Sequence, residues 1–259
     1  MKDVSKNLAP LAAAINAPSQ PTIVDRATYQ AERDKLLVRE KAHTREGDAI
    51  AAARRRLPMV EVDARTPVIG AAGMVPLIDT FEGRSQLYAS YHMWHTGRPA
   101  ADQCEGCTFN SGHVLELSYL HSRDVTFAVF CEGPYDAISR YRDFMGWEMP
   151  WYSVPEASMD RLFAAGQHFG MKVCYLRDGD RVFETYWTTG RGCEVMGNSY
   201  GMLDMMVYGR QEPWEDSPEG WPQPFGGPDG HAFRLNGRPI SQWPRLAAGR
   251  SDDLGTTGH

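Results

Sequence analysis

Asp102-Gln103-Cys104-Glu105-Gly106-Cys107-Thr108-Phe109 is the stretch that decides the fold, because it places a C-x-x-C pair between two different kinds of predicted element. The residues before it, 85–93, predict a β-strand, and residues 107–121 predict an α-helix. At a helix N-terminus, free backbone N–H groups and the positive end of the helix dipole stabilise a thiolate. This context predicts that Cys104 is a nucleophile and that Cys107 is the resolving thiol.

The elements after this pair continue an alternating α/β pattern. Residues 125–130 form an apolar run typical of a buried strand, and residues 135–145 predict a second helix. Residues 172–176 and 181–187 predict two strands joined by an Asp-Gly turn, which is a strong hairpin signal. A βαβ unit followed by a β-hairpin is the thioredoxin-like layout. The predicted fold class is therefore α/β, as a thioredoxin-like three-layer α/β/α sandwich with a long N-terminal helix and an irregular C-terminal tail.

Composition divides the chain into four parts. Residues 1–24 are expected to form a flexible leader, residues 25–57 a helical arm, and residues 58–210 the thioredoxin-like domain. Residues 196–208 carry an apolar stretch that predicts the closing helix of this domain, packed against the sheet. Residues 211–259 are rich in Pro, Gly and Trp without periodicity and predict an irregular extension.

The arm is predicted as one long helix from the N-cap Asp25 to Arg56, with a possible break near Gly47. At 1.5 Å per residue it approaches about 45 Å, which exceeds the width of a compact domain of this size. It could therefore reach a second protomer and support a homodimer. The alternative is an arm that lies on its own domain through four apolar residues, namely Tyr29, Leu36, Leu37 and Ile50.

Bulk properties exclude several classes of function. The 259-residue chain has a formal net charge of −6 and a pI near 5.8, so it lacks the basic surface that nucleic acids or anionic membranes require. Five cysteines are too few and too odd in number for a secreted disulfide scaffold, which favours a cytoplasmic protein with free thiols. No nucleotide-binding or nucleophile-elbow motif lies at a predicted strand-to-helix junction, and no cofactor is expected.

Two metal interpretations compete with a redox dithiol. Structural zinc needs a second ligand pair, which does not follow at the usual spacing. A soft metal such as copper could be held by Cys104 and Cys107 together with His92 or His95, which end the preceding predicted strand. Otherwise these histidines are expected to form local hydrogen bonds. The remaining cysteines, Cys131, Cys174 and Cys193, have no partner at motif spacing and are expected to be small buried or half-buried residues.

The residues between the two cysteines also bear on the redox potential. Glu105 places a negative charge beside Cys104, and a like charge raises the pKa of a group that must ionise. A less stable thiolate lowers the reduction potential of a dithiol, so the sequence predicts that the protein acts as a reductant.

Four segments together resemble the bacterial thioredoxin-like proteins of domain of unknown function family 899, over roughly residues 25–210. The segments are Arg54-Arg55-Arg56-Leu57-Pro58-Met59-Val60, Leu77-Ile78-Asp79-Thr80-Phe81-Glu82-Gly83-Arg84-Ser85-Gln86-Leu87, the Cys104 to Phe109 stretch, and Met145-Gly146-Trp147-Glu148-Met149-Pro150-Trp151. The resemblance implies a fold of the thioredoxin and peroxiredoxin group but names no substrate. The chain departs from that group at Phe169-Gly170-Met171, where a cis-proline is usual.

Three functions follow as expectations. The first is a cytosolic thiol–disulfide oxidoreductase or thiol-dependent peroxidase that uses Cys104 and Cys107 on a protein or small-molecule disulfide or peroxide. The second is a metal-binding or metallochaperone-like protein that uses the same cysteines with His92 or His95. The third is a non-catalytic interaction protein that keeps the fold.

Overall fold

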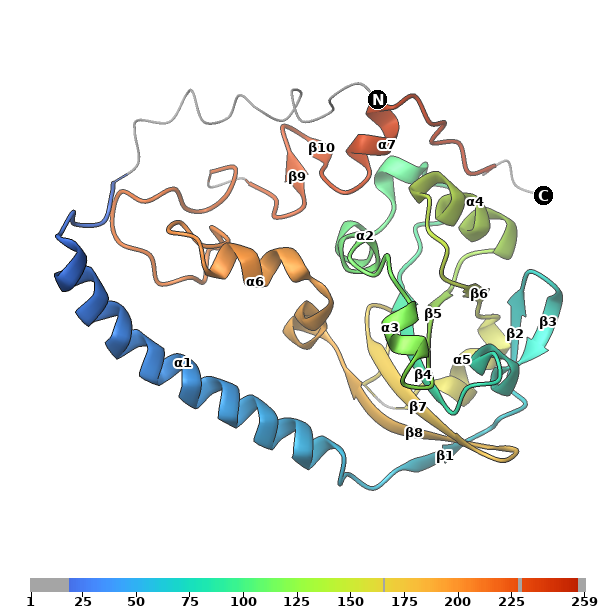
Figure 1. Cartoon of the computed structure of the whole chain (residues 1–259). Helices are drawn as coiled ribbons and strands as arrows, with labels where there is room; N and C mark the ends of the chain where they lie inside the picture. Colours follow the sequence, from blue (N-terminus) through green and yellow to red (C-terminus); the bar gives the residue numbers. More distant parts are fainter. Residues whose placement is uncertain (1–18, 165, 228–229, 256–259) are drawn as a thin grey trace.

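The computed structural model describes residues 19–164, 166–227 and 230–255, so residues 1–18 of the predicted leader lie outside the described residues. An eight-stranded mixed sheet forms its centre, with the order β1-β8-β7-β4-β5-β6-β2-β3 (Figure 1). Its strands are β1 (Val60–Val62), β2 (Pro67–Gly70), β3 (Gly73–Pro76), β4 (Gln86–His92), β5 (Val125–Cys131), β6 (Trp151–Ser153), β7 (Lys172–Asp178) and β8 (Arg181–Thr188). The four strands predicted for the domain are confirmed as β4, β5, β7 and β8.

The strand directions establish a thioredoxin-like fold. Strand β5 runs parallel to β4 and β6 runs parallel to β5, as crossover connections through helices require. Strand β7 runs antiparallel to β4, and β8 folds back on β7 through the pair Asp178 and Arg181. Gly179 in this turn has φ +60°, a backbone conformation that glycine adopts without steric cost. The predicted βαβ unit followed by a β-hairpin is therefore confirmed.

The helices confirm some predicted boundaries and correct others. They are α1 (Arg26–Arg54), α2 (Glu105–Gly112), α3 (Ser118–His121), α4 (Tyr135–Met145), α5 (Glu156–Leu162), α6 (Asn198–Asp204) and α7 (Trp243–Ala247). Helix α4 matches its predicted range of 135–145. The single helix predicted over 107–121 is wrong, because the chain starts its helix at Glu105 and leaves it at Gly112. His113 then caps the helix, and its Nδ1 binds the Phe109 carbonyl at 2.7 Å.

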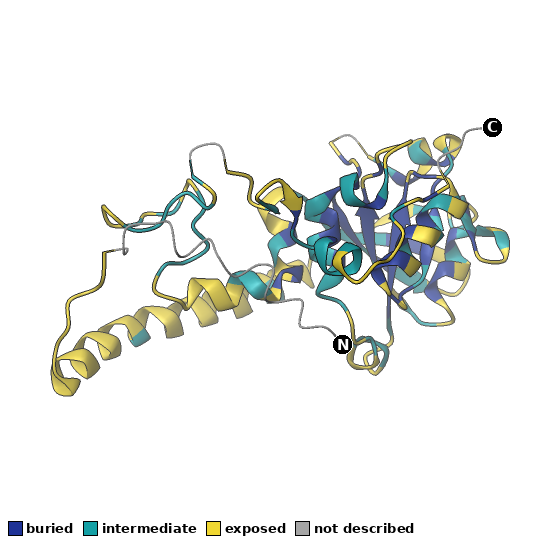
Figure 2. Ribbon diagram, turned by 90° about the horizontal axis from the view of Figure 1, so that it is seen from above, coloured by how far each residue is buried: buried dark blue, intermediate teal, exposed yellow. Residues whose placement is uncertain are grey.

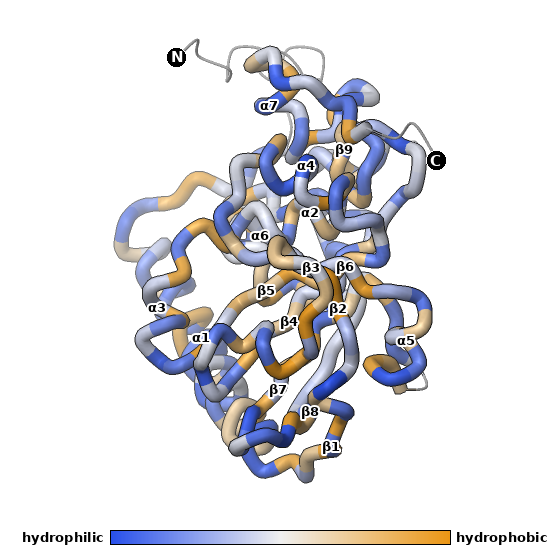
Figure 3. Tube along the Cα trace, turned by 90° about the vertical axis from the view of Figure 1, so that its right-hand side faces the viewer, coloured by the Kyte–Doolittle hydropathy of each residue, from blue (hydrophilic) through white to orange (hydrophobic). Residues whose placement is uncertain are grey.

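Two apolar clusters cover the two faces of the sheet and give the three-layer sandwich. Strand β5 shows the alternation: Phe127 and Val129 belong to the cluster beneath α4, whereas Ala128 and Phe130 belong to the cluster beneath α5. Hydrophobic residues are concentrated along the central strands (Figure 3). The dithiol segment lies at the end of one of these strands, β4, so a rigid sheet supports it.

Helix α1 projects from the sandwich as an arm (Figure 2). Asp25 is its N-cap, with its side chain accepting a hydrogen bond of 2.8 Å from the Thr28 N–H, as predicted. The helix continues unbroken through Gly47 and contains no buried residue. Tyr29, Leu36 and Ile50 are exposed and Leu37 is half-buried, so the structure does not show the arm lying on its own domain through all four residues. No helix in residues 19–164, 166–227 and 230–255 has the length and hydropathy to span a membrane.

The segment 196–208 departs from its predicted role as a closing helix on the sheet. It contains the end of the 3-10 helix η4 (Gly190–Met196) and the short helix α6. Met196 is buried, but the apolar residues after it are exposed, namely Met202, Leu203, Met205, Met206 and Val207. Helix α4 and the large aromatic residues around it pack on one face of the sheet, and none of these five exposed residues belongs to that cluster.

The extension after residue 210 is mostly irregular, as predicted, but it returns to the dithiol. Its elements are the two-stranded hairpin β9 (Arg234–Leu235) and β10 (Arg238–Pro239), followed by α7, and they lie beside α2 in Figure 1. Gln242 is fully buried and donates a hydrogen bond of 3.2 Å to the Gln103 carbonyl. The extension therefore forms part of the wall around Cys104.

Candidate functional site

The two cysteines of the C-x-x-C pair lie at the start of helix α2, after the loop that follows strand β4. Cys104 is the N-cap of α2 and Cys107 lies in its first turn. Both are free thiols, with Cys104 8% exposed and Cys107 5% exposed. The Cys104 carbonyl accepts hydrogen bonds from the Thr108 N–H at 3.0 Å and the Thr108 hydroxyl at 2.7 Å, which hold the N-cap in place. The predicted dithiol is thus at a helix N-terminus.

The surroundings of Cys104 favour its thiolate. A hydrogen bond from the Cys107 thiol is the largest cause, and the backbone N–H groups of Cys107 and Gly106 and the charge of His95 act in the same direction. Burial opposes them, but together they lower the pKa of Cys104 to about 6 from an ordinary value of 9.0. Cys104 is therefore ionised near neutral pH, which is the state a nucleophilic thiol requires.

Cys107 has the opposite character. Its hydrogen bond to Cys104 and its burial raise its pKa well above the ordinary value of 9.0. Because Cys107 holds its proton while Cys104 is ionised, the two thiols have different chemical states in the reduced protein. The predicted roles, with Cys104 as the nucleophile and Cys107 as the resolving thiol, require such a division and stay a prediction.

Glu105 does not act on Cys104 as an isolated charge. Its carboxylate pairs with Arg234 Nε of the C-terminal extension, and His231 Nδ1 lies 3.4 Å from its other oxygen. Arg234 also lies 3.5 Å from the Asp102 carboxylate. The expectation that Glu105 raises the pKa of Cys104 is corrected by these contacts, because a guanidinium offsets the carboxylate.

The surroundings of His92 and His95 bear on the metal interpretation, which stays a hypothesis. The His92 ring is fully buried against Trp151, with ring centroids 5.0 Å apart, and burial lowers its pKa to about 3. Neither ring nitrogen of His92 has a hydrogen-bond partner, whereas His95 Nδ1 makes the expected local bond, 2.7 Å from the Asp102 carbonyl. Within the described residues, no three His, Cys, Asp or Glu side chains are grouped to hold a metal ion.

A pocket of about 430 Å³ opens beside the dithiol. Cys104 and Cys107 lie on one wall, and Gly170 and Cys193 on the wall formed by the start of β7 and by η4. Gly170 lies just before β7, in the segment where the thioredoxin group usually has a cis-proline, and its φ of +98° is a conformation that glycine adopts readily. The remaining walls are largely apolar and aromatic, including Met93, Phe169, Tyr200 and Phe233.

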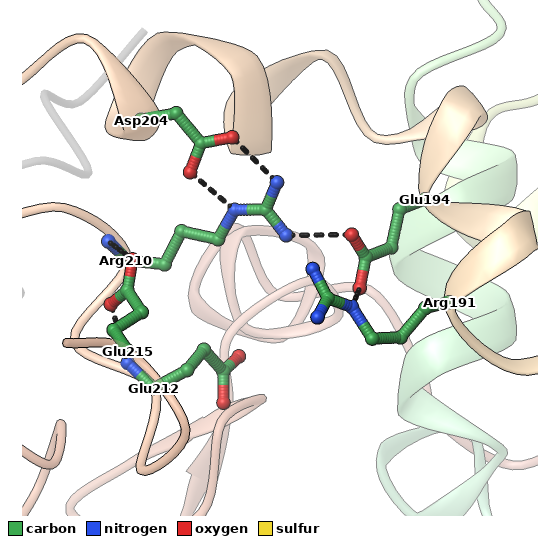
Figure 4. A network of polar contacts seen from close by, with 6 residues as sticks. All are labelled: Arg191, Glu194, Asp204, Arg210, Glu212 and Glu215. Atoms are coloured by element: carbon green, nitrogen blue, oxygen red, sulfur yellow. Dashed lines mark hydrogen bonds and ion pairs between the residues drawn. The ribbon is translucent and has the colours of Figure 1, made fainter.

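An arginine network fixes one side of this pocket (Figure 4). Arg210 makes two hydrogen bonds to the Asp204 carboxylate, at 2.6 and 2.7 Å, and one of 2.8 Å to Glu194. Glu194 also pairs with Arg191 at 3.0 Å. Because Arg191 and Glu194 line the pocket, these bonds connect the pocket wall to α6 and to the start of the extension.

The fold brings four residues to the dithiol that sequence reasoning did not assign to it: Lys172, Cys193, Phe233 and Arg234. Cys193 is buried, as expected, but its thiol donates to the Gly170 carbonyl at 3.4 Å within the same pocket. Lys172 had a detectable signal, because it stands inside an apolar alternating run where a charged residue is unexpected. No sequence signal pointed to Phe233 and Arg234, because they lie in a segment without periodicity.

Comparison with known proteins gives distant similarities of structure. A Chlorobium tepidum protein described as a thiol:disulfide interchange protein DsbE is 14% identical, with a TM-score of 0.38 over 54% of this chain and 94% of that chain. Peroxiredoxin Q of Xanthomonas campestris is 12% identical, with a TM-score of 0.34 over 55% and 96%. Peroxidoxin BcpB of Mycobacterium tuberculosis is 11% identical, with a TM-score of 0.33 over 55% and 94%.

The comparison of sequences gives a family. No protein of curated function matches the chain. A model of the family described as "Bacterial protein of unknown function (DUF899)" matches residues 18–225, a longer span than the resemblance in the sequence indicated, so the chain belongs to that family.

Proposed function

We propose that this protein is a thiol–disulfide oxidoreductase in which Cys104 attacks the substrate and Cys107 resolves the mixed disulfide. The observation that carries the proposal is the paired state of the two thiols at the N-terminus of α2. Cys104 has a pKa of about 6, and Cys107 donates a hydrogen bond to it while keeping its own proton. A reactive thiolate with a second thiol in contact is what reversible disulfide exchange requires.

The pocket favours small substrates. It holds about 430 Å³ beside sulfurs that are nearly buried, and aromatic side chains form much of its wall. A small-molecule disulfide fits this space better than a folded protein surface does. An alkyl hydroperoxide is the second candidate, because a nearly buried thiolate beside an apolar pocket also suits attack on a peroxide oxygen.

The cycle requires a compartment that returns the dithiol to its reduced state. All five cysteines are free thiols, which suits the cytoplasm, where thiols are kept reduced. An unidentified protein or small-molecule thiol would act as the electron donor there.

The test measures turnover and the covalent state of the two cysteines together. The reduced protein is mixed in turn with a small organic disulfide, cumene hydroperoxide and insulin, with dithiothreitol as the reductant. We expect turnover of the small disulfide or the hydroperoxide, and mass spectrometry should find a Cys104–Cys107 disulfide. Cys104→Ser should abolish turnover.

Cys174→Ser provides the matched control, because Cys174 lies on β7 outside the pocket and burial raises its pKa to about 11. This variant should turn over at the wild-type rate. Absence of turnover and of the Cys104–Cys107 disulfide with every substrate would leave a non-catalytic interaction protein as the better description.

A further inference from the structure

Lys172, the first residue of β7, is a lysine inside the protein. Its side chain is 1% exposed, and its ammonium group donates a hydrogen bond of 2.8 Å to the Ser90 hydroxyl. Across the described ranges 19–164, 166–227 and 230–255, none of the ion pairs includes Lys172. A buried ammonium without a carboxylate is costly, so its surroundings must supply negative charge or it must lose its proton.

The sheet register directs Lys172 toward the dithiol. Lys172 stands opposite Ser90 of β4 on one side and opposite Thr188 of β8 on the other, and directly opposed residues share one face of a sheet. Cys107 lies at the same end of the sheet, because it lines one pocket with Met93, the residue after β4, and with Gly170, two residues before Lys172. The Cys193 thiol reaches it from η4 and points at the Thr188 carbonyl, 3.8 Å away.

The groups near Lys172 that can carry a negative charge are the cysteine sulfurs. Burial lowers the pKa of Lys172, whereas thiolates at Cys107, Cys193 or Cys104 raise it. In return, the ammonium lowers the pKa of Cys107 and of Cys193.

The carboxylates nearest the dithiol pair with arginines and not with Lys172: Glu105 pairs with Arg234, and Glu194 pairs with Arg191 and Arg210. Burial holds the pKa of His92 at about 3, so its ring is neutral, and burial raises the pKa of Tyr141, whose hydroxyl keeps its proton. His95 faces Cys104 from the loop after β4, where a protonated ring would add a positive charge. A thiolate is therefore the counter-ion that this site offers to Lys172.

We propose that Lys172 is a positioning residue whose ammonium stays as the counter-ion while the negative charge moves from Cys104 to Cys107. The inference rests on the proposed function and adds to it the means by which the second thiol is activated. In the reduced protein the charge is on Cys104. Once Cys104 is bonded to the substrate, the hydrogen bond that held the proton on Cys107 has lost its anionic acceptor, and the ammonium then favours a thiolate at Cys107.

The exchange balances in two steps. The Cys104 thiolate attacks one sulfur of a disulfide R–S–S–R′, forming the Cys104–S–R bond and releasing R′S⁻. The proton of Cys107 passes to the released thiolate or, where that thiolate is a weak base, to the buffer. The Cys107 thiolate then attacks Cys104 Sγ, forming the Cys104–Cys107 disulfide and releasing RS⁻. The substrate gains two electrons and the dithiol loses two, while Lys172 keeps its proton during both attacks.

Lys172→Met tests the proposal, with the chromogenic disulfide DTNB as the probe. One coloured thiolate leaves when Cys104 attacks and a second leaves when Cys107 resolves, so stopped-flow absorbance separates the two steps. Without the ammonium, the pKa of Cys107 in the mixed disulfide should rise by about one unit, which slows the second phase about tenfold at pH 7. The pH midpoint of that phase should rise as well.

The control is Lys35→Met, the same substitution on the exposed helix α1, which should leave both phases unchanged. A structural role for Lys172 would lower the urea midpoint without moving the pH midpoint of the second phase. Because Lys172→Met removes a buried charge, we expect the urea midpoint to stay equal or rise. Equal second-phase rates and pH midpoints in wild type and Lys172→Met would overturn the proposal.

The wild-type protein provides a measurement that needs no folded variant. The disulfide form contains no thiolate at Cys104 or Cys107, so the pKa of Lys172, followed through its ε-carbon by NMR, should fall on oxidation. An unchanged titration would also overturn the inference. If the wild-type protein shows no second DTNB phase, the proposed function itself is overturned. If the second phase is present but is the same in wild type and Lys172→Met, only the inference about Lys172 is overturned.

Discussion

Arg234 forms an ion pair with Glu105, the first residue of α2, although 129 positions separate the two residues in sequence. The pair places a positive charge beside the dithiol from a segment beyond residue 225, where the family match ends. Gln242 and Phe233 approach α2 from the same extension, through a hydrogen bond to Gln103 and a ring contact with Phe109 at 5.6 Å. The extension therefore helps to set the electrostatics of the thiols.

Arg234→Gln should raise the pKa of Cys104, because Glu105 would then act on the thiolate without compensation. We expect a rise of about one unit, the lower end of the shift that a nearby charge produces. The rate of alkylation by iodoacetamide against pH measures the shift directly. The double variant Glu105→Gln with Arg234→Gln should return the midpoint toward the wild-type value. An unchanged midpoint in the single variant Arg234→Gln would show that the ion pair does not affect the pKa of Cys104.

The architecture was predictable wherever local signals and tertiary packing agree. The helix at 135–145 has an amphipathic pattern and ends at Gly146, whose φ of +74° suits a helix C-terminus, and both of its ends were predicted. The C-x-x-C spacing located the two thiols. The prediction of a sheet-packed helix over 196–208 failed because its apolar residues give a local helix signal, whereas the fold leaves those after Met196 exposed.

The rest of the site depends on contacts that no local pattern contains. Lys172 reaches Ser90 across 82 positions, and Gln242 reaches Gln103 across 139. Strand β6 (Trp151–Ser153) is also too short to give a periodic signal, although it contributes Trp151 to the packing of His92. The charge balance around Cys104 therefore emerges only from the fold.

Cys107→Ala should slow the reaction of Cys104 at neutral pH. The wild-type alkylation rate should rise as the pH increases through about 6, because the reactive species is the thiolate and the pKa of Cys104 is depressed. Removing the Cys107 thiol deletes the largest cause of that depression, so the midpoint should move upward. Cys107→Ser keeps a donor and should keep a lower midpoint than Cys107→Ala. Mass spectrometry of labelled peptides should find Cys104 modified before Cys131, Cys174 and Cys193.

Gly170→Ala should destabilise the protein through its backbone. The φ of +98° is unfavourable for any residue with a Cβ, although the new methyl group would meet Met93 Cε at 3.6 Å, Met93 Sδ at 3.8 Å and His168 Nδ1 at 3.9 Å, all ordinary contacts. We expect a loss of about 1–2 kcal/mol in the free energy of unfolding, measured by urea denaturation. Gly201→Ala is the control, because that glycine lies in α6 with nothing within 4 Å of a Cβ. Equal losses for both variants would show that the conformation of Gly170 is not the cause.

The arm helix α1 predicts self-association. Tyr29, Leu36 and Ile50 are exposed and recur at multiples of seven residues, which places them along one stripe of the helix. At 1.5 Å per residue, the 29 residues of α1 extend about 44 Å without burying a side chain in their own domain. We propose that two copies of the chain pair through this stripe, because a partner helix offers the apolar cover that the domain does not.

Leu36→Glu places a charge at the centre of that stripe and should shift the protein from dimer to monomer. Val38→Glu makes a matched change two residues away, on the opposite side of the helix, where the side chain is 67% exposed. It should leave the dimer intact. Light scattering and sedimentation over a range of concentrations measure both masses. A wild-type protein that stays monomeric throughout, or a Leu36→Glu variant with unchanged mass, would contradict an interface on this stripe. If both variants dissociate, the interface involves the helix but not the seven-residue stripe.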